Sequence, residues 1–294
     1  MKILLTGASG LLGTALRSKL TQDGHTVVPF KFPHDSDALR SPATATQLSA
    51  ALADTDGMIH LSGKNVATRW TDKNKELIRQ SRITTTQIAA ACLTKNNAKN
   101  KFFVHASATG IYGTHASLDV TENSPAGSGF LAEVCRDWEA ACAVAAEAGT
   151  RVVHLRFGPV LSRDGGMLKA LLPVFRLGLG GPIGEGQRWL SWIHITDAVQ
   201  ILADAAANKD WSGPINVVSP YAITNAEFTK SLAKALHRPA LFPLPPPVLI
   251  ALLGEMAKET ILSDLRVKPA VLLERGFRYQ FPDCPRALNQ LLNL

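Results

Sequence analysis

Residues 1–13 read MKILLTGASGLLG, and this stretch decides how the rest of the chain is interpreted. The apolar run at 3–5 predicts a buried strand, and helix-forming residues follow from 14 to 20. Between them lie Gly7, Gly10 and Gly13 at three-residue spacing. A strand, a glycine turn and a helix in this order are typical of a dinucleotide-binding unit. The alternative is a strand–turn–helix whose glycines only serve packing.

Each glycine has its own task in such a unit. Gly7 permits the tight turn, Gly10 lets the backbone approach a pyrophosphate, and Gly13 lets the helix pack against the strand. The phosphates would then meet the free N–H groups and the positive dipole end of the helix. The residues expected to form this site are Gly7, Ser9, Gly10, Leu11, Leu12 and Gly13.

Composition restricts the class of protein. The chain has 294 residues, 46% of them hydrophobic and 19% charged, as in ordinary globular proteins. The net charge of +7 is spread along the chain, which favours small anionic ligands over nucleic acid. The apolar run at 248–253 is too short to span a bilayer, so we expect no membrane partner. We expect an unidentified small-molecule substrate, and a homodimer is the assembly to test.

The four cysteines, at 92, 135, 142 and 284, form no C-x-x-C pair and no metal-ligand spacing. The sequence therefore predicts neither a disulfide framework nor a metal site, and it favours a reducing compartment. The first strand begins at once, which leaves no room for a signal peptide. We expect a cytoplasmic protein.

The end of the second strand, at 26–30, indicates which cofactor binds. An acid there would bind the ribose 2′-hydroxyl, whereas a cation accommodates a 2′-phosphate. The chain has Lys31 and Phe32 at this point and no acid before Asp35. This favours NADP over NAD, with Arg82 in the long helix expected at 70–96 as a second cation. The alternatives are a solvated lysine and a surface salt bridge.

Strands and helices alternate up to about residue 161, which is the pattern of a doubly wound α/β protein. We expect a Rossmann-type parallel sheet over 1–161, to which strand elements near 189–220 return, and a smaller substrate or lid lobe over 162–294. Three further strand ends would pass close to a cofactor. They carry Leu61, Ser62 and Gly63; Ser107; and Gly158 and Val160.

Four motifs form a shared pattern: Thr6-Gly7-x-x-Gly10-x-x-Gly13, Tyr112-Gly113, Arg156-x-Gly158 and Trp192-Ile193-His194-Ile195-x-Asp197. In these the chain resembles an extended short-chain dehydrogenase/reductase. Further motifs are Trp138-Glu139, the stretch 175–184, Asn225-x-Glu227-Phe228 and Gly276-Phe277. They resemble the epimerase family branch of the 39U type. That branch implies an NADP(H)-binding Rossmann domain with a small C-terminal domain over the active site.

The chain departs from the superfamily where proton transfer takes place. The resemblance implies a Tyr and a Lys four residues apart on one helix, where the Lys lowers the pKa of the Tyr. Phe130 and Val134 occupy these two positions, and neither side chain can carry a proton. The position of the usual Ser falls on Ala108, although Ser107 and Thr109 flank it. Phe32 replaces the Arg that usually ends the second strand in the branch.

Another residue must therefore transfer protons if the protein is an enzyme. The candidates are Tyr112 at a strand end, Glu133 if it is buried, and Ser107. Each has a purely structural alternative, and His194 is better explained as a hydrogen-bonded core histidine. Two functions remain: an NADP(H)-dependent oxidoreductase or epimerase with non-standard catalytic residues, and a non-catalytic NADP(H)-binding sensor or partner-binding module.

Overall fold

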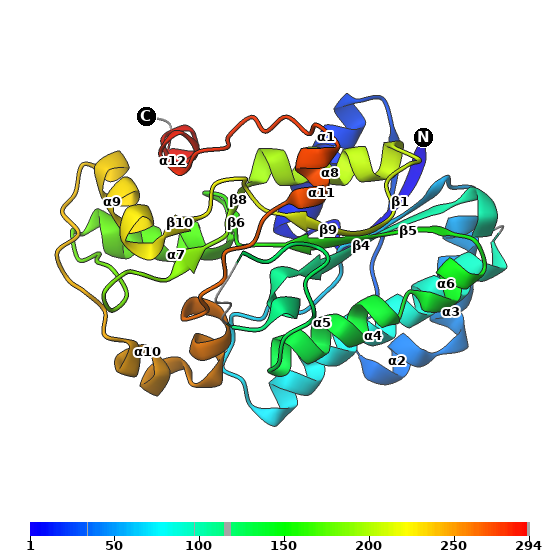
Figure 1. The fold of residues 1–294 in the computed structure, drawn as a ribbon. Coiled ribbons are helices and arrows are strands. Elements are labelled where there is room, and N and C mark those ends of the chain that lie inside the picture. The colour runs from blue at the N-terminus through cyan, green and yellow to red at the C-terminus, as the bar shows by residue number, and fades with distance from the viewer. Residues whose placement is uncertain (34, 97, 115–118, 293–294) are drawn as a thin grey trace.

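The computed structural model describes residues 1–33, 35–96, 98–114 and 119–292. Its centre is a six-stranded, all-parallel sheet (Figure 1). In spatial order the strands are β2 (Thr26–Phe30), β1 (Lys2–Thr6), β3 (Gly57–His60), β4 (Phe102–Ala108), β5 (Arg151–Phe157) and β9 (Gly213–Val217). This is the doubly wound α/β fold that the sequence predicts.

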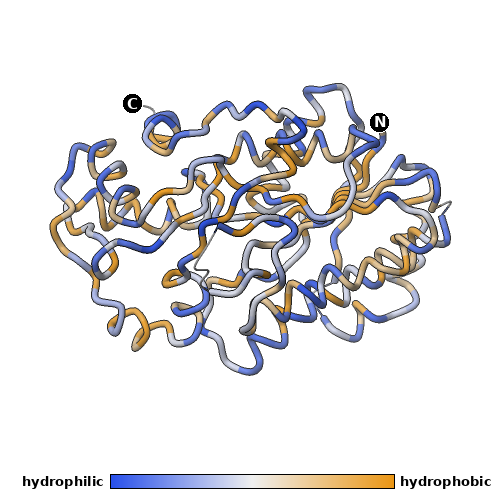
Figure 2. Tube along the Cα trace, in the orientation of Figure 1, coloured by the Kyte–Doolittle hydropathy of each residue, from blue (hydrophilic) through white to orange (hydrophobic). Residues whose placement is uncertain are grey.

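Helices cover both faces of the sheet, as Figure 1 shows. On one face lie α1 (Leu11–Gln22), α8 (Ile195–Ala207) and the short α11 (Ala270–Glu274). On the other lie α2 (Ser36–Arg40), α3 (Pro42–Ala53), α4 (Asp72–Lys95), α5 (Phe130–Ala140) and α6 (Ala143–Glu147). Apolar residues gather along the central strands (Figure 2), because a parallel sheet is buried on both faces.

The strand order locates the crevice of the sheet. From β1 the chain goes to β2 on one side and then crosses to β3 on the other side of β1. In open α/β sheets, ligands bind outside the carboxyl ends of the strands at such a reversal. The glycine turn after β1 and the turn after β3 both lie at this point.

A smaller lobe follows β5. It contains α7 (Gly166–Arg176), α9 (Asn225–Leu236), α10 (Pro246–Leu253) and α12 (Cys284–Leu292). Two short strand pairs join it: β6 (Val160–Leu161) with β8 (Ile193–His194), and β7 (Trp189–Leu190) with β10 (Ile223–Thr224). Trp192 is fully buried in the core of this lobe. No described helix is long and apolar enough to cross a bilayer.

Two helices expected as continuous are interrupted. The helix predicted over 130–148 breaks at Ala141–Cys142, which gives α5 and α6. The helix predicted over 248–263 ends at Gly254, whose φ of +64° suits glycine, and a π-helical turn at Ala257–Ile261 follows. Leucine-rich α7, which contains Pro173, forms where the sequence pattern is loose.

The strand register arranges side chains in rows across the α4 face of the sheet. Thr6, His60, His105 and His154 are register neighbours on four adjacent strands. His60 lies between Thr6 Oγ1, 2.7 Å from Nδ1, and Thr85 Oγ1, 3.2 Å from Nε2. Because the Thr85 hydroxyl donates to a backbone carbonyl, it accepts from Nε2–H, and Thr6 donates to Nδ1. The neutral imidazole is therefore fully hydrogen-bonded.

We expect this histidine row to destabilise the protein in acid. Burial lowers the pKa of His60 to about 3, so below pH 6.5 the unfolded state takes up a proton that the folded state does not. The free energy of unfolding should fall by about 1.4 kcal/mol per pH unit from this residue alone as pH drops from 6.5 towards 4. Urea denaturation between pH 7.5 and 4.5 should show a shallower pH dependence for His60→Gln. The exposed control His237→Asn should keep the full dependence, and an unchanged slope in His60→Gln would contradict this account.

Candidate functional site: the glycine turn and the carboxyl edge of the sheet

The glycine turn is packed too tightly for side chains at two positions. Gly7 has φ +69°, and a Cβ on it would lie 2.7 Å from the carbonyl carbon of Leu61. A Cβ on Gly13 would lie 2.1 Å from the carbonyl oxygen of Gly7. The turn therefore needs glycine to hold α1 against β1 and the end of β3, which are the tasks expected of these two residues.

The first turn of α1 is open to an anion. Gly10 is its N-cap, and among the described residues no side chain caps the helix and no acid lies in its first turn. The N–H groups at a helix start, together with the helix dipole, favour a negatively charged ligand. Ser9 and Gly10 are exposed there.

Other predicted cofactor residues converge on the same place. Leu12, Leu61 and Val160 pack against the core cluster between the sheet and the helices α1 and α8, and a Cβ on Gly7 would touch the backbone of Leu61. Gly165 lies over Leu11, where an added Cβ would be 3.1 Å from Leu11 Cδ1. Gly158 serves packing, because a Cβ on it would lie 2.2 Å from the carbonyl oxygen of Ser191.

The two residues at the end of β2 point in different directions. Lys31 is exposed, whereas Phe32 is only 6% exposed and packs edge-on against Phe30 and His60, with ring centroids 5.2 and 5.8 Å away. The Phe32 side chain belongs to the core, so only its backbone faces a ligand. Of the two side chains, only Lys31 can reach one.

Arg82 lies against the turn that follows β3. Its Nη1 donates to the carbonyls of Lys64 (2.9 Å) and Ile78 (3.2 Å), and its guanidinium lies 5.0 Å from the Trp138 ring centroid. A Cβ on Gly63 would be 3.2 Å from Arg82 Cζ. These contacts fix the backbone of 63–64 at the crevice.

A buried polar network lies at the carboxyl ends of β4 and β5. The guanidinium of Arg156 forms a two-pronged pair with Glu139, through Nε and Nη2 at 2.9 Å each. The Ser107 hydroxyl donates to Glu139 Oε1 at 2.6 Å. Tyr112 accepts from Arg156 Nη1 at 2.9 Å and donates to Asn216 Oδ1 at 2.7 Å. The network therefore joins β4, β5, α5 and β9.

The network shifts the pKa of two of its members, Glu139 and Tyr112. Burial alone would raise the pKa of Glu139, but the hydrogen bonds and charge of Arg156 outweigh it and hold the pKa below its usual range. Burial also raises the pKa of Tyr112, against the opposing effect of Arg156. At neutral pH, Glu139 is thus ionised and Tyr112 keeps its proton.

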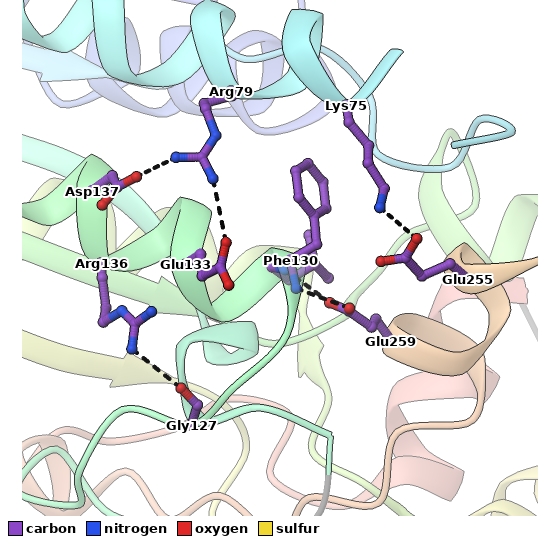
Figure 3. A network of polar contacts seen from close by, with 10 residues as sticks. Lys75, Arg79, Gly127, Phe130, Glu133, Arg136, Asp137, Glu255 and Glu259 are labelled. Atoms are coloured by element: carbon purple, nitrogen blue, oxygen red, sulfur yellow. Dashed lines mark hydrogen bonds and ion pairs between the residues drawn. The ribbon is translucent and has the colours of Figure 1, made fainter. Parts of the chain in front are cut away.

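The structure brings together two of the three residues expected to be catalytic. Ser107 and Tyr112 meet through Glu139 and Arg156, and they are 3% and 5% exposed. Glu133 does not join them. Its side chain is 53% exposed and points towards Arg79 of α4, 3.5 Å away (Figure 3), so it fails the condition of burial on which its expected role depended.

Phe130, at the position implied for the missing Tyr, starts α5 in a contact between distant parts of the chain (Figure 3). The Glu259 carboxylate accepts from the N–H groups of Phe130 (2.9 Å) and Leu131 (2.8 Å) and so caps the helix. The Phe130 ring packs edge-on against Trp70 at 4.9 Å, and Lys75 Nζ lies 5.0 Å from its centroid.

Lys75 is paired in turn with Glu255, four residues before Glu259. Sequence reasoning missed Glu139, Asn216, Glu255 and Glu259 as site residues. Only Glu139 had a local signal, as part of the Trp138-Glu139 motif. Val134 is 1% exposed and faces the core.

We expect Glu139 and Glu133, both on α5, to respond very differently to the same substitution. Glu139→Gln leaves the Arg156 charge buried without a partner charge and should lower the free energy of unfolding by about 3–5 kcal/mol. Glu133→Gln breaks only a partly exposed pair and should cost less than about 1 kcal/mol. Urea denaturation at pH 7 measures both free energies of unfolding. Equal losses in the two variants would show that the buried pair contributes no more to stability than the exposed one.

Comparison with known proteins identifies the family. Residues 3–218 match the NAD dependent epimerase/dehydratase family, and residues 244–291 match a domain of unknown function, DUF1731. The epimerase family protein Mb2239 of Mycobacterium bovis is 39% identical over 290 residues, covering 97% of this chain and 96% of that protein. Human epimerase family protein SDR39U1 is 35% identical over 301 residues, covering 99% and 100%.

Solved structures of epimerases have the same fold as this chain. Human SDR39U1 (isoform 2), crystallised with NADPH, superimposes with a TM-score of 0.90 at 34% identity and covers 100% of this chain and 99% of that chain. A nucleoside-diphosphate sugar epimerase from Corynebacterium glutamicum gives a TM-score of 0.79 at 33% identity, covering 99% and 58%. These matches confirm the predicted resemblance. The chain belongs to the NAD-dependent epimerase/dehydratase family, in the branch of the SDR39U1 epimerase family proteins.

Proposed function

We propose that this protein binds NADP(H) in the crevice between β1 and β3 and acts as an oxidoreductase or epimerase with non-standard catalytic residues. The uncapped start of α1 at the glycine turn carries the proposal, because it offers a pyrophosphate its N–H groups and no competing acid. The NADPH in the human relative supports the choice of cofactor. The proposed location is the cytoplasm, since the four cysteines are buried free thiols.

The cofactor residues divide by task in this proposal. The glycine turn and the first residues of α1 hold the pyrophosphate, and exposed Lys31 pairs with the adenosine 2′-phosphate. Arg82 holds the turn 61–64 in place and does not bind the cofactor directly, because its guanidinium already donates to the carbonyl of Lys64. Ser107 and the segment that contains Gly158 and Val160 lie at the carboxyl ends of β4 and β5, towards the reactive end of the cofactor.

We expect NADPH to bind more tightly than NADH. Lys31→Ala should weaken NADPH alone by about 1.5–3 kcal/mol, the value of a charge-assisted hydrogen bond, because NADH has no 2′-phosphate. Arg82→Ala should weaken both cofactors, since it releases the turn after β3. Calorimetric titration of both cofactors measures this, with Lys19→Ala, which removes a cation paired with Asp23 in the last turn of α1, as a control. Equal affinities of the natural protein for NADPH and NADH would refute the preference.

Proton transfer needs a route that avoids positions 130 and 134. Lysine cannot simply be restored at 134, because the Val134 side chain is buried in the core and an ammonium there would lose its water. Of the candidates, we favour Tyr112 over Glu133, because Tyr112 shares the buried network with Ser107. Ser107 and Tyr112 both donate their hydroxyl protons within the protein, to Glu139 and to Asn216, so Tyr112 must first release Asn216 before it can give its proton to a ligand.

We expect a reductase rate that depends on Tyr112 to fall only on the alkaline side of neutral pH. Burial raises the pKa of this phenol, so it remains a proton donor through the neutral range. Oxidation of NADPH by a panel of carbonyl compounds, followed from pH 6 to 11, should lose this alkaline limb in Tyr112→Phe. Glu133→Gln should leave the profile unchanged. If the reverse pattern appears, the assignment of the two residues is wrong.

A non-catalytic, cofactor-binding function is the second candidate. The observation that favours it is that Ser107 and Tyr112 both donate their hydroxyl protons within the protein. The same panel separates the two functions. NADPH that binds tightly and is not consumed by any carbonyl compound would support a sensor or partner-binding module.

A further inference from the structure

Three potential metal ligands meet beneath the buried network. They are His105 on β4, His154 on β5 and Cys142 between α5 and α6, with one ligand atom of each within 4.8 Å of the others. The two histidines are register neighbours on adjacent strands and therefore project from the same face of the sheet. Cys142 is the N-cap of α6 and lies next to the two histidines, because the helix expected over 130–148 breaks at this residue.

The separation of the two imidazoles suits a shared ion. Their Nδ1 atoms are 3.5 Å apart. Two nitrogens bound at 2.0–2.1 Å to one three- or four-coordinate metal ion lie about 3.3–3.6 Å apart. The sulfur needs to move by no more than about 1 Å to complete a metal–sulfur bond of about 2.3 Å.

The surroundings prepare the histidines as ligands. His105 Nε2 lies 3.4 Å from Thr86 Oγ1, which also accepts from Trp138 Nε1 at 3.0 Å. Such a partner on the far ring nitrogen orients a metal-binding imidazole. Burial lowers the pKa of both His105 and His154, so both rings are neutral at neutral pH.

Charge and coordination number select the ion. His105 and Cys142 are buried and His154 is half-buried, and the nearby Glu139 carboxylate is occupied by Arg156 and Ser107, so the described residues supply no fourth ligand. A divalent ion with one thiolate would leave a net positive charge in the core, which is costly. A cuprous ion with one thiolate is neutral, and copper is typical of His₂Cys trigonal donor sets.

We propose that His105, His154 and Cys142 form a three-coordinate thiolate–imidazole site for Cu⁺. Burial raises the pKa of the Cys142 thiol, so its proton leaves to solvent only as the Cu–S bond and two Cu–N bonds form, and no atom changes oxidation state. The ligands His105 and His154 lie two residues before Ser107 and Arg156 on β4 and β5. The bound ion therefore stabilises the part of the sheet directly below the candidate active site.

The test uses the full-length, cofactor-free protein under anaerobic conditions. Cu⁺ is titrated in competition with a chromogenic Cu⁺ chelator, and bound copper is counted by elemental analysis. We expect one Cu⁺ per chain, with at least a 100-fold loss of affinity in Cys142→Ser and in His154→Gln. X-ray absorption should show one sulfur and two nitrogens around the copper.

Matched controls are Cys284→Ser and His194→Gln, which lie in the small lobe and should bind one Cu⁺ as the natural chain does. Circular dichroism establishes that each variant is folded. The proposal is overturned if Cu⁺ binding persists in folded Cys142→Ser, or if the natural chain binds none. It is also overturned if the site takes Zn²⁺ in preference to Cu⁺. In the first two cases the contact between His105 and His154 is only a hydrogen bond within the core and Cys142 is core packing.

Discussion

The buried pair of Arg156 and Glu139 is the interaction on which the carboxyl edge of this protein depends. It connects the second half of the sheet to α5, and through Tyr112 and Asn216 it reaches the last strand of the sheet. Arg156 Nη1 also donates to the carbonyl of Glu122 at 3.2 Å. Either charge buried without the other would be strongly destabilising, so Arg156 and Glu139 must stay paired. The elements that carry the two residues and their hydrogen-bond partners are therefore held in one arrangement.

The sheet positions this pair through its register. Side chains alternate between faces along each strand, so three successive rows face α4 and α5. Phe103 and Val152 form an apolar row, His105 and His154 a polar one, and Ser107 and Arg156 the row at the crevice. Polarity thus rises in steps from the core to the ligand side, and each polar row is hydrogen-bonded to the helices that cover it.

Local sequence signals were sufficient for the start of the fold and insufficient for the centre of the site. Gly7 and Gly13 are recognisable because their constraint, a tight turn under a helix, lies within a few residues. The position of β9 was predicted only as a return to the sheet, and the partner of Asn216 on it is 104 residues away. Glu133 was chosen by helical position, but helical position alone does not tell which face is buried.

The same reasoning explains the break at Cys142 and the cap by Glu259. Residues 130–148 are rich in alanine and contain neither Gly nor Pro, so propensity predicts one helix and tertiary packing divides it. Glu259 caps a helix 129 residues earlier in the chain. No periodicity or spacing connects two such positions, because their contact is made by the fold and not by the local chain.

The Glu259 contact also sets an order of events during synthesis. On the ribosome, α5 emerges long before the carboxylate that satisfies its first N–H groups, and before the strand that carries Asn216. Until then, the nascent Rossmann unit has an unfinished helix start and an open sheet edge beside β5. The sheet edge beside β5 and the first turn of α5 are thus completed only after residues 213–217 and 259 have left the ribosome.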